Sequence, residues 1–351
     1  MAPSGTMEII GQVRQIIPRG GQGPPVRLRW RARRCGLLGG ATILALACSG
    51  AVPTPPTESD DRRLLTTVAG APAPPPHGPG SGGDPALALG APQRAAQART
   101  VADALAAYAK HLERAETRRI AAAKSWGLRR VPLRAPAPPA EKPELTSEPG
   151  HIAGKGLPPV IVRVPTDEKV VFLTIDDGAE KDPKLLEMMR ELDIPYSSFL
   201  SDYVARDDYD YFRQAHRDGS GIQNHSVNHR EMPKLSYEEQ RTEICRQQDT
   251  LEEEIGERPT LFRPPYGAYD RDTLRAAASC GVEVVPLWAE EAFPDRIAWG
   301  RGDEKLQPGD IILTHFRGTS EWGGSMPDMV RRVLDTATAQ GFALARLEDY
   351  L

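Results

Sequence analysis

From residue 158 to the C-terminus, short β-rich apolar runs alternate with helical stretches. The run "VVFLTI" precedes "DPKLLEMMREL", "PYSSFL" precedes "DYDYFRQAHRDG", "TLFRPPYG" precedes "DRDTLRAAASCG", and "DIILTHF" precedes "MPDMVRRVLDTATAQG". The run "VEVVPLW" leads into a long segment that is expected to be an irregular loop. Strands that alternate with helices form parallel sheets joined by crossover helices. About seven such units in this length predict an α/β fold, and they fit a compact β/α barrel of about seven strands better than an open sheet.

The charge of the chain is divided unevenly. Residues 1–150 hold 20 Lys and Arg against 11 Asp and Glu, a net charge of +9, whereas residues 151–351 hold 24 against 37, a net charge of −13. An acidic C-terminal half argues against nucleic acid as its partner.

The N-terminal segment is typical of an export signal. The stretch "RLRWRARRCGLLGGATILALACSG" has a basic start and an apolar run of about a dozen residues, which is short for a membrane span but right for a signal-peptide core. Residues 1–48 are therefore expected to be a signal peptide. "LALAC" resembles a lipobox with Cys48 as the lipid acceptor, and Arg33-Arg34 permits a twin-arginine signal instead. The protein is expected to be secreted or lipid-anchored at a bacterial cell surface, with no other membrane contact.

Between this signal and the acidic domain lie two linkers and a helix. Segments rich in Pro, Gly and Ala do not bury enough apolar surface to offset their ordering entropy. The helix carries an apolar stripe of Val101, Leu105, Tyr108 and Leu112, and we favour a solvated spacer or a helix packed on the main domain over a partner-binding helix. The predicted boundaries are a flexible linker over 49–92, a helical spacer over 93–130, a second linker over 131–157 and the main domain over 158–351.

Residues suited to catalysis follow the predicted strands. In a β/α barrel the loops after the strands carry the chemistry. The residues in such positions are Asp176, Asp177, His225, His229, Arg263, Tyr266, Trp288, Glu290, Glu291 and His315.

"NHSVNH" suggests a metal site. If this segment is a helical turn, the four-residue spacing places both imidazoles, His225 and His229, on one face. One carboxylate from a neighbouring strand loop completes a three-ligand set with an open position for water. Of Asp176 and Asp177, one is then the ligand and the other handles the proton of the bound water. Because neighbouring side chains of a strand point to opposite sides, the two carboxylates need not share one environment.

Each of these residues also has a structural interpretation. The Asp pair could cap the following helix, but Asp182, directly before Pro183, suits that cap better. His315 could be a buried, satisfied histidine, but its strand-end position favours a functional role. Cys245 and Cys280 lie on consecutive predicted helices, and in an exported protein a disulfide is commoner than two free thiols; both alternatives stay open.

Four motifs in order, "TIDDG", "HSVNH", "RPPYG" and "ILTHF", resemble the polysaccharide deacetylases of carbohydrate esterase family 4, the NodB homology domain. The resemblance covers roughly residues 165–351. It implies a distorted (β/α) barrel that removes N- or O-acetyl groups from sugars with one divalent metal ion. Zinc is the first expectation, with cobalt, nickel or manganese as alternatives.

The resemblance also implies a role for each matching residue. Asp176 would be the general base, and Arg263 would pair with it and orient it. Asp177 would bind the metal together with His225 and His229. The remaining roles are the backbone N–H of Tyr266 at the oxyanion, His315 as general acid, Leu313 as the wall around the acetyl methyl, and Trp288 as the matching pocket tryptophan.

One loop departs from the family pattern. In "LWAEEAFPDRIAW", Glu291 takes the position of the first expected Asp and Pro294 that of the second, so the carboxylate that tunes His315 is either missing or supplied by Glu290, Glu291 or Asp295. Phe316 replaces the Asp that often follows the last His.

Three functions follow from these observations. The first is a deacetylase acting on a cell-wall or other polysaccharide, a monomer with an acetylated glycan substrate. The second is a catalytically silent or reduced glycan-binding module, which the altered loop suggests. The third is an amidase or esterase acting on a non-sugar acyl group.

Overall fold

The computed structural model describes the backbone of residues 91–351 and side chains from residue 99. The predicted signal peptide over 1–48, with Cys48, and residues 49–90 of the predicted linker lie outside the described residues. Residues 113–351 belong to one compact unit, and residues 91–112 to a second. Between residues 91 and 351, no helix has the length and apolarity needed to cross a membrane.

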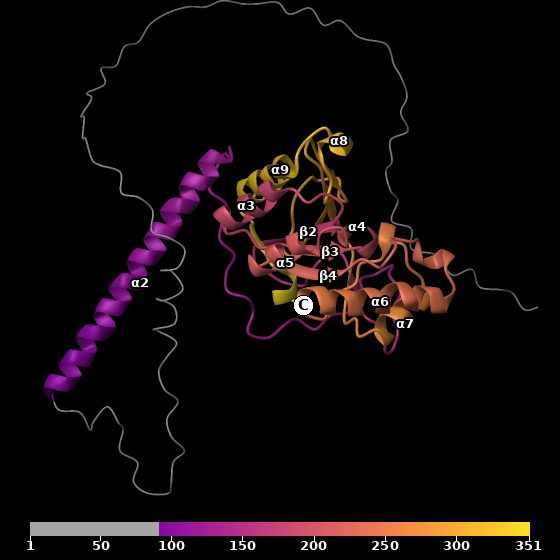
Figure 1. Ribbon diagram of the computed structural model, residues 1–351, viewed down its shortest axis with the longest axis horizontal. Coiled ribbons are helices and arrows are strands. Elements are labelled where there is room, and N and C mark those ends of the chain that lie inside the picture. The colour runs from indigo at the N-terminus through magenta and orange to yellow at the C-terminus, as the bar shows by residue number, and fades with distance from the viewer. Residues whose placement is uncertain (1–90) are drawn as a thin grey trace, which may run out of the picture. The chain divides into compact units, whose positions relative to one another are not determined.

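The centre of the domain is a mixed sheet built around β2 (Val170–Asp177), which pairs in parallel with β3, β8 and β9. The strand order is β4-β3-β2-β8-β6-β7, and only the β6–β7 pair is antiparallel. Figure 1 shows β2, β3 and β4 side by side. The other strands of this sheet are β3 (Ser197–Leu200), β4 (Gly221–Asn224), β6 (Glu290–Ala292), β7 (Ile297–Trp299), β8 (Ile311–His315) and β9 (Ala343–Ala345).

A second, two-stranded sheet pairs β1 (Val160–Ile161) with β5 (Val285–Pro286). Single bridges, Asn224 to Phe262 and Leu261 to Val284, continue from the β4 edge toward β5. The predicted α/β class is confirmed, with a sheet of mixed strands, while the closed barrel stays a prediction.

Helices cover the sheet in pairs. α3 (Pro183–Leu192) packs against α9 (Met326–Ala339), and α6 (Tyr237–Ile255) packs against α7 (Arg271–Ser279), as Figure 1 shows. Asp182 caps α3 by accepting a hydrogen bond from the Lys184 N–H at 2.9 Å, which confirms its predicted role. The remaining short elements are α4 (Asp202–Ala205), α5 (Tyr209–Arg217), α8 (Thr319–Trp322) and the 3₁₀ turns Met232–Lys234, Pro265–Gly267 and Leu347–Asp349.

The alternation of β2 divides the core. Val171, Leu173 and Ile175 belong to one cluster with the buried faces of α3 and α9, whereas Val170 and Phe172 belong to another. Each fully buried side chain of this size contributes about 1.5–3 kcal/mol. Because both faces of β2 are buried, its polar C-terminal residues are held in a rigid frame.

The end of α2 (Ala91–Ser125) is part of this domain. Ala122 and Ala123 are buried in the first cluster, and the buried Arg119 donates a hydrogen bond to the Pro132 carbonyl at 2.8 Å. Leu133 forms a bridge with Ala343. The predicted spacer and second linker therefore contact the main domain over these residues. By contrast, the side chains of the predicted stripe, Val101, Leu105, Tyr108 and Leu112, are exposed.

Two segments differ from the sequence-based expectation. "TLFRPPYG" forms only single bridges at Leu261 and Phe262 before a 3₁₀ turn, because Pro264 and Pro265 have no N–H to donate to a ladder. The predicted irregular loop after Trp288 contains the β6–β7 hairpin instead. Its strand "EEA" has low β-propensity, so pairing with β8 and β7 is what fixes it.

A disulfide joins Cys245, on α6, to Cys280, the residue after α7, with the two Cα atoms 4.9 Å apart. Of the two alternatives left open by the sequence, the structure has the bridge. The bridge joins α6 to the end of α7, and these two helices lie beside each other in Figure 1.

Candidate functional site

The two carboxylates that end β2 both approach His225. Asp176 Oδ2 lies 3.6 Å from His225 Nε2, and Asp177 Oδ1 lies 3.7 Å from the same nitrogen. Their other partners differ, as expected: Asp176 Oδ1 pairs with Arg263 Nη1 at 2.6 Å, whereas Asp177 Oδ1 lies 3.2 Å from His229 Nε2. Asp177 has a left-handed backbone with φ of 78°, so the alternation of the strand stops at Asp176 and both side chains turn to the same side.

Left-handed backbone is concentrated at this site. Of six non-glycine residues with positive φ in the described chain, Asp177, Ser226, His229 and Tyr266 lie at the site. Each such conformation costs about 1–3 kcal/mol and persists only where surrounding contacts enforce it. The chain therefore holds its polar side chains here at the expense of stability, as functional sites do.

His225 is the buried member of the histidine pair. Residues 225–229 form an irregular loop, so the predicted helical turn was wrong, although the two rings still lie 4.9 Å apart. The Nδ1–H of His225 donates a hydrogen bond to the Arg263 carbonyl at 2.7 Å, which leaves the Nε2 lone pair facing the carboxylates. Burial, and then His229, lower the pKa of His225 to about 3, so its imidazole is neutral at pH 7.

The histidine loop is held from α6. The backbone N–H and the side-chain amide of Asn228 donate to the two carboxylate oxygens of Glu243, both at 2.8 Å. Glu243 is buried, and its carbonyl accepts from the Val227 N–H at 3.1 Å. Our sequence reasoning missed this clamp, for which the signal is an acidic residue on the buried face of a predicted helix.

Asp177, His225 and His229 form the predicted three-ligand cluster. Their ligand atoms lie within 4.8 Å of one another, and His229 Nε2 is 3.2 Å from Asp177 Oδ1. Ligands of a tetrahedral zinc ion at about 2.0–2.1 Å are themselves separated by about 3.3 Å. Asp177 Oδ1 is buried and has no hydrogen-bond partner among the described residues. An orphaned carboxylate oxygen facing two imidazole nitrogens fits a divalent metal ion.

The charge state of Asp177 suits this role. Burial alone would raise the pKa of its carboxyl group, but the close contact with His229 and the nearby His315 and His225 together hold the pKa well below its usual value. The group is therefore ionised at neutral pH, as a metal ligand has to be.

Arg263 fixes Asp176. Its Nη1 lies 2.6 Å from Asp176 Oδ1, and its guanidinium is fully buried over the Phe199 ring at 4.2 Å. It also donates to the Thr174 hydroxyl at 2.9 Å and to the carbonyls of Pro286 at 2.9 Å and Leu287 at 3.1 Å. Burial raises the pKa of Asp176 to about 7, although the charge of Arg263 acts to lower it. This pKa is higher than pairing with a cation alone would give.

His315 lies across from Asp176. The two residues are register partners on the adjacent parallel strands β8 and β2. Glu291 Oε1 lies 3.6 Å from His315 Nδ1. Glu290 points the other way, because neighbouring side chains alternate along β6, and pairs with Arg301 at 2.8 Å. Asp295 is exposed and pairs with Arg296. Of the candidate carboxylates, only Glu291 contacts His315 in the described chain.

Phe316 has a packing role. It is fully buried, and its ring lies edge-on to Phe212 with centroids 5.5 Å apart. Its N–H donates to the Asp176 carbonyl at 2.9 Å, and its carbonyl accepts from the Glu180 N–H at 3.0 Å. The residue that stands where the family often has Asp therefore links the loops that follow β2 and β8.

The remaining predicted residues lie around this centre. The half-exposed Tyr266 ring is 4.6 Å from the His229 ring. Trp288 lies against Gly267, where an added Cβ would come within 3.0 Å of the indole. Leu313 is buried two residues before His315 and so faces the same side of β8. The roles of the Tyr266 N–H and of Leu313 stay predictions.

Arg317 is a residue that sequence reasoning did not single out. Its Nη2 lies 3.5 Å from Asp177 Oδ2, on the oxygen opposite to the one that faces the histidines. The available signal was a basic residue directly after the final motif.

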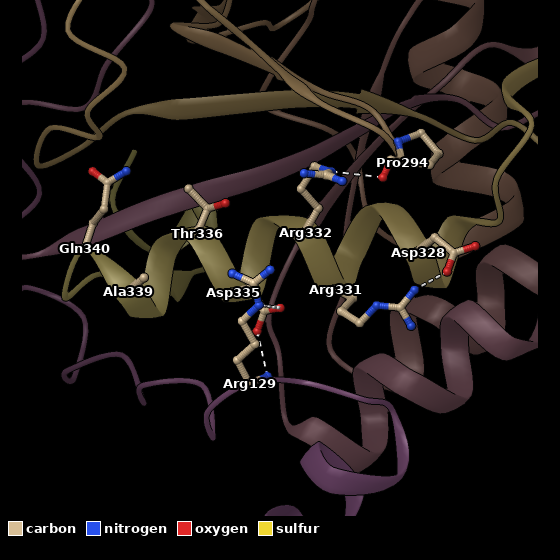
Figure 2. A pocket seen from close by; sticks show the side chains of 9 residues that line it. All are labelled: Arg129, Pro294, Asp328, Arg331, Arg332, Asp335, Thr336, Ala339 and Gln340. Carbon is tan, nitrogen blue, oxygen red and sulfur yellow. Dashed lines mark hydrogen bonds and ion pairs between the residues drawn. The ribbon is translucent and has the colours of Figure 1, made fainter. Parts of the chain in front are cut away.

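A separate hollow of about 370 Å³ lies along α9 (Figure 2). Its arginines are all paired: Arg129 with Asp335, Arg331 with Asp328, and Arg332 with the Pro294 carbonyl at 2.9 Å. No residue of the three-ligand cluster lines it. The hollow is therefore separate from the residues with catalytic chemistry, which lie at the strand ends.

The sequence relationships agree with this placement. The polysaccharide deacetylase family model matches residues 163–285, a span that includes both aspartates, both histidines and Arg263 but ends before Glu291 and His315. An uncharacterised protein of Streptomyces coelicolor is 40% identical over 218 residues, which cover 61% of this chain and 87% of the relative. The chain belongs to the polysaccharide deacetylase family, carbohydrate esterase family 4, whose members are hydrolases.

Characterised relatives are more distant. The peptidoglycan-N-acetylglucosamine deacetylase of Bacillus cereus is 27% identical over 199 residues, covering 54% of this chain and 91% of that protein. The crystal structure of a peptidoglycan N-acetylglucosamine deacetylase superposes with a TM-score of 0.49 and 22% identity, covering 55% of this chain and 92% of that one.

Proposed function

We propose that the protein is a metal-dependent deacetylase that hydrolyses acetyl groups, N-acetyl before O-acetyl, of a cell-wall polysaccharide outside the cytoplasm. The observation that carries the proposal is the opposition of Asp176 and His315 on adjacent strands, beside the cluster of Asp177, His225 and His229. The export signal expected from the sequence, and relatives whose names give peptidoglycan as their substrate, support the location and the substrate class.

In this mechanism each residue has one task. A divalent ion held by Asp177, His225 and His229 would polarise the acetyl carbonyl and lower the pKa of a bound water molecule. Asp176, with a pKa of about 7, accepts a proton from the attacking water. Arg263 keeps the carboxyl group of Asp176 in place through their 2.6 Å contact.

His315 donates a proton to the leaving nitrogen. Burial lowers the pKa of His315 to about 4, so the free protein holds a neutral imidazole at pH 7. His315 therefore has to gain a proton during turnover before it can donate one to the leaving nitrogen. The nearest source is the proton that Asp176 has removed from the attacking water. Glu291, 3.6 Å away, stabilises the imidazolium while that proton is held.

The contact between Glu291 and His315 also bears on the two alternative functions, a silent glycan-binding module and an amidase or esterase for a non-sugar substrate. A silent glycan-binding module was suggested by a missing tuning carboxylate, and Glu291 occupies a position beside His315 that supplies one. An amidase or esterase acting on a non-sugar acyl group would use the same residues, and substrate choice decides between the two.

The test is acetate release from peptidoglycan, chitin oligomers and acetylated xylan by zinc-loaded protein. We expect release from at least one glycan, its loss on Asp176→Asn with metal binding retained, and full activity of the control Asp182→Asn, whose amide still caps α3. Glycan binding without acetate release under any metal would refute the enzymatic function. An active Asp176→Asn protein would refute the base.

A further inference from the structure

Arg317 is placed at the site by rigid neighbours. It follows Phe316, which is fixed in the core, and its N–H donates to the His315 carbonyl at 3.0 Å. The next residue, Gly318, lies so close to Glu180 that an added Cβ would meet the carboxylate at 2.5 Å. The path of the chain on both sides of Arg317 is therefore fixed, and only its side chain is free to vary.

The guanidinium of Arg317 lacks the partners of a structural arginine. Its contacts are ion pairs of 3.5 Å with Asp177 and 3.8 Å with Glu321, and within the described chain it makes no side-chain hydrogen bond. Its side chain is 40% exposed, whereas that of Arg263 is 0% exposed and makes four hydrogen bonds. A guanidinium has five N–H donors, so that of Arg317 retains unused donor capacity.

The position of the Arg317 guanidinium suits the binding of an anionic ligand group. Asp177 Oδ1 faces the histidines, and a cation bound there would draw on the same carboxylate that Arg317 now contacts through Oδ2. The cation would also repel the guanidinium. In addition, the charge of Arg317 acts on Glu291 and His315, at the acid side of the site. The arginine thus lies between the ligand carboxylate and the residues that serve the leaving group.

We propose that Arg317 is a specificity-determining residue that binds a carboxylate of the substrate, on the acetylated sugar or on the sugar next to it. This deepens the proposed function and rests on it, since the substrate becomes an acidic amino-sugar glycan. Arg binds carboxylates in a planar, two-pronged geometry that neither a hydroxyl nor a neutral sugar satisfies. The carboxylate is either an acid ether on the acetylated sugar or a uronic acid beside it.

The experiment compares kcat/KM on matched glycans with zinc-loaded protein. The acidic substrates are an N-acetylmuramic-acid oligomer and an oligomer of alternating uronic acid and N-acetylglucosamine. Each is tested both as the free acid and as its methyl ester, and a neutral chitin oligomer is tested beside them. We expect wild-type protein to prefer one free acid over its ester by about 10- to 100-fold, the range for a charged hydrogen bond. Which acid is preferred identifies the position of the carboxylate.

Arg317→Gln should remove that preference, bringing the ratio of kcat/KM for acid and ester close to one, chiefly by raising KM for the acid. Arg317→Lys should retain part of it. The control is Arg296→Gln, an exposed arginine paired with Asp295, which should keep the full preference. Zinc affinity of Arg317→Gln, measured by chelator competition, should equal or exceed that of wild type, because a repelling charge is removed; a loss of more than about twofold would show that Arg317 supports the metal site through Asp177 and would overturn the proposal.

A wild-type protein that treats acid and ester alike overturns the inference, as does an Arg317→Gln variant that loses both substrates equally. If no glycan releases acetate, the proposed function has failed, and the inference is decided by equilibrium binding of the same acid and ester pairs to wild type and Arg317→Gln. Equal affinities there refute it, and an acid preference that depends on Arg317 supports it.

Discussion

Asp176 and Asp177 are covalent neighbours whose pKa values move in opposite directions. Burial raises that of Asp176 to about 7, whereas His229, His315 and His225 outweigh burial at Asp177 and lower its pKa. The different partners of the two carboxyl groups separate a proton acceptor from a permanent anion. This separation is the basis of the residue-level predictions.

Glu291 should be needed for rapid turnover and Glu290 should not. We expect Glu291→Gln to lower kcat about 10-fold or more, within the range that general acid catalysis contributes, because the imidazolium of His315 loses its carboxylate partner. The loss of kcat should grow as pH rises. Without the negative charge of Glu291, the imidazolium of His315 is less stable and gives up its proton at a lower pH. Steady-state rates between pH 5 and 9 measure this, with Glu290→Gln as the matched neighbour; equal losses in the two variants would contradict the assignment.

Removal of metal should destabilise the protein through Asp177. Zinc at 100 times its dissociation constant stabilises a folded protein by about 2.7 kcal/mol, which corresponds to about 5–10 °C in melting temperature for a domain of this size. We expect a chelator to lower the melting temperature of wild type by this amount and to leave Asp177→Asn unchanged. The exposed Asp295→Asn should respond like wild type. A chelator response retained by Asp177→Asn would exclude that residue as a ligand.

At the level of elements, β6 turns one acidic residue to each side. Glu291 faces His315, and Glu290 enters a buried group in which Arg301 binds both Glu290 at 2.8 Å and Asp310 at 2.5 Å. Burial, and then Asp310, raise the pKa of Glu290 to about 8 despite Arg301. The buried end of β6 therefore holds a proton at neutral pH.

This raised pKa predicts the pH dependence of stability. Between the unfolded pKa of about 4.5 and the folded pKa of about 8, the folded state keeps a proton that the unfolded state has lost, so the free energy of unfolding should fall as pH rises through that window. Glu290→Gln should flatten the profile and exceed wild type by about 1 kcal/mol or more at pH 8, because its buried amide stays uncharged at every pH, as the protonated acid does only at lower pH. Urea unfolding at pH 5, 6.5 and 8 measures it. The exposed Glu283→Gln is the control, and an unchanged slope in Glu290→Gln would contradict the prediction.

For the whole molecule, the boundary of the folded domain lies within α2. Ala122, Ala123, Trp126 and Leu128 pack in the core cluster of the domain, whereas the apolar side chains between residues 101 and 112 are exposed. A chain that begins at residue 113 should melt within about 2 °C of one that begins at residue 91. A chain that begins at residue 130 should melt lower, by about 2–4 °C for each kcal/mol lost. Circular dichroism measures both, and equal melting temperatures for all three chains would place the boundary after residue 130.

Much of the strand and helix order was predictable from sequence, because β2, α3 and α9 have strong periodicity and clear end signals. Asp182 before Pro183 is an example, since the cap is set by the local sequence alone. The positions of Asp177 and His229 were not predictable, because their left-handed backbones result from tertiary contacts. The pairing of Glu291 with His315 depends on a hairpin whose first strand, β6, has weak β-propensity, so that Pro294-Asp295 indicates the turn but not the strand before it.

The disulfide has a consequence for the order of events in maturation. Cys245 lies two residues after Glu243, the residue that clamps the histidine loop, so oxidation fixes the same turn of α6 that positions the loop. A chain still in a reducing compartment would have this turn less firmly held against its neighbour helix. We therefore expect newly made protein to bind its metal ion efficiently only after Cys245 and Cys280 are oxidised. Passage into an oxidising compartment would then also be the step that activates the protein.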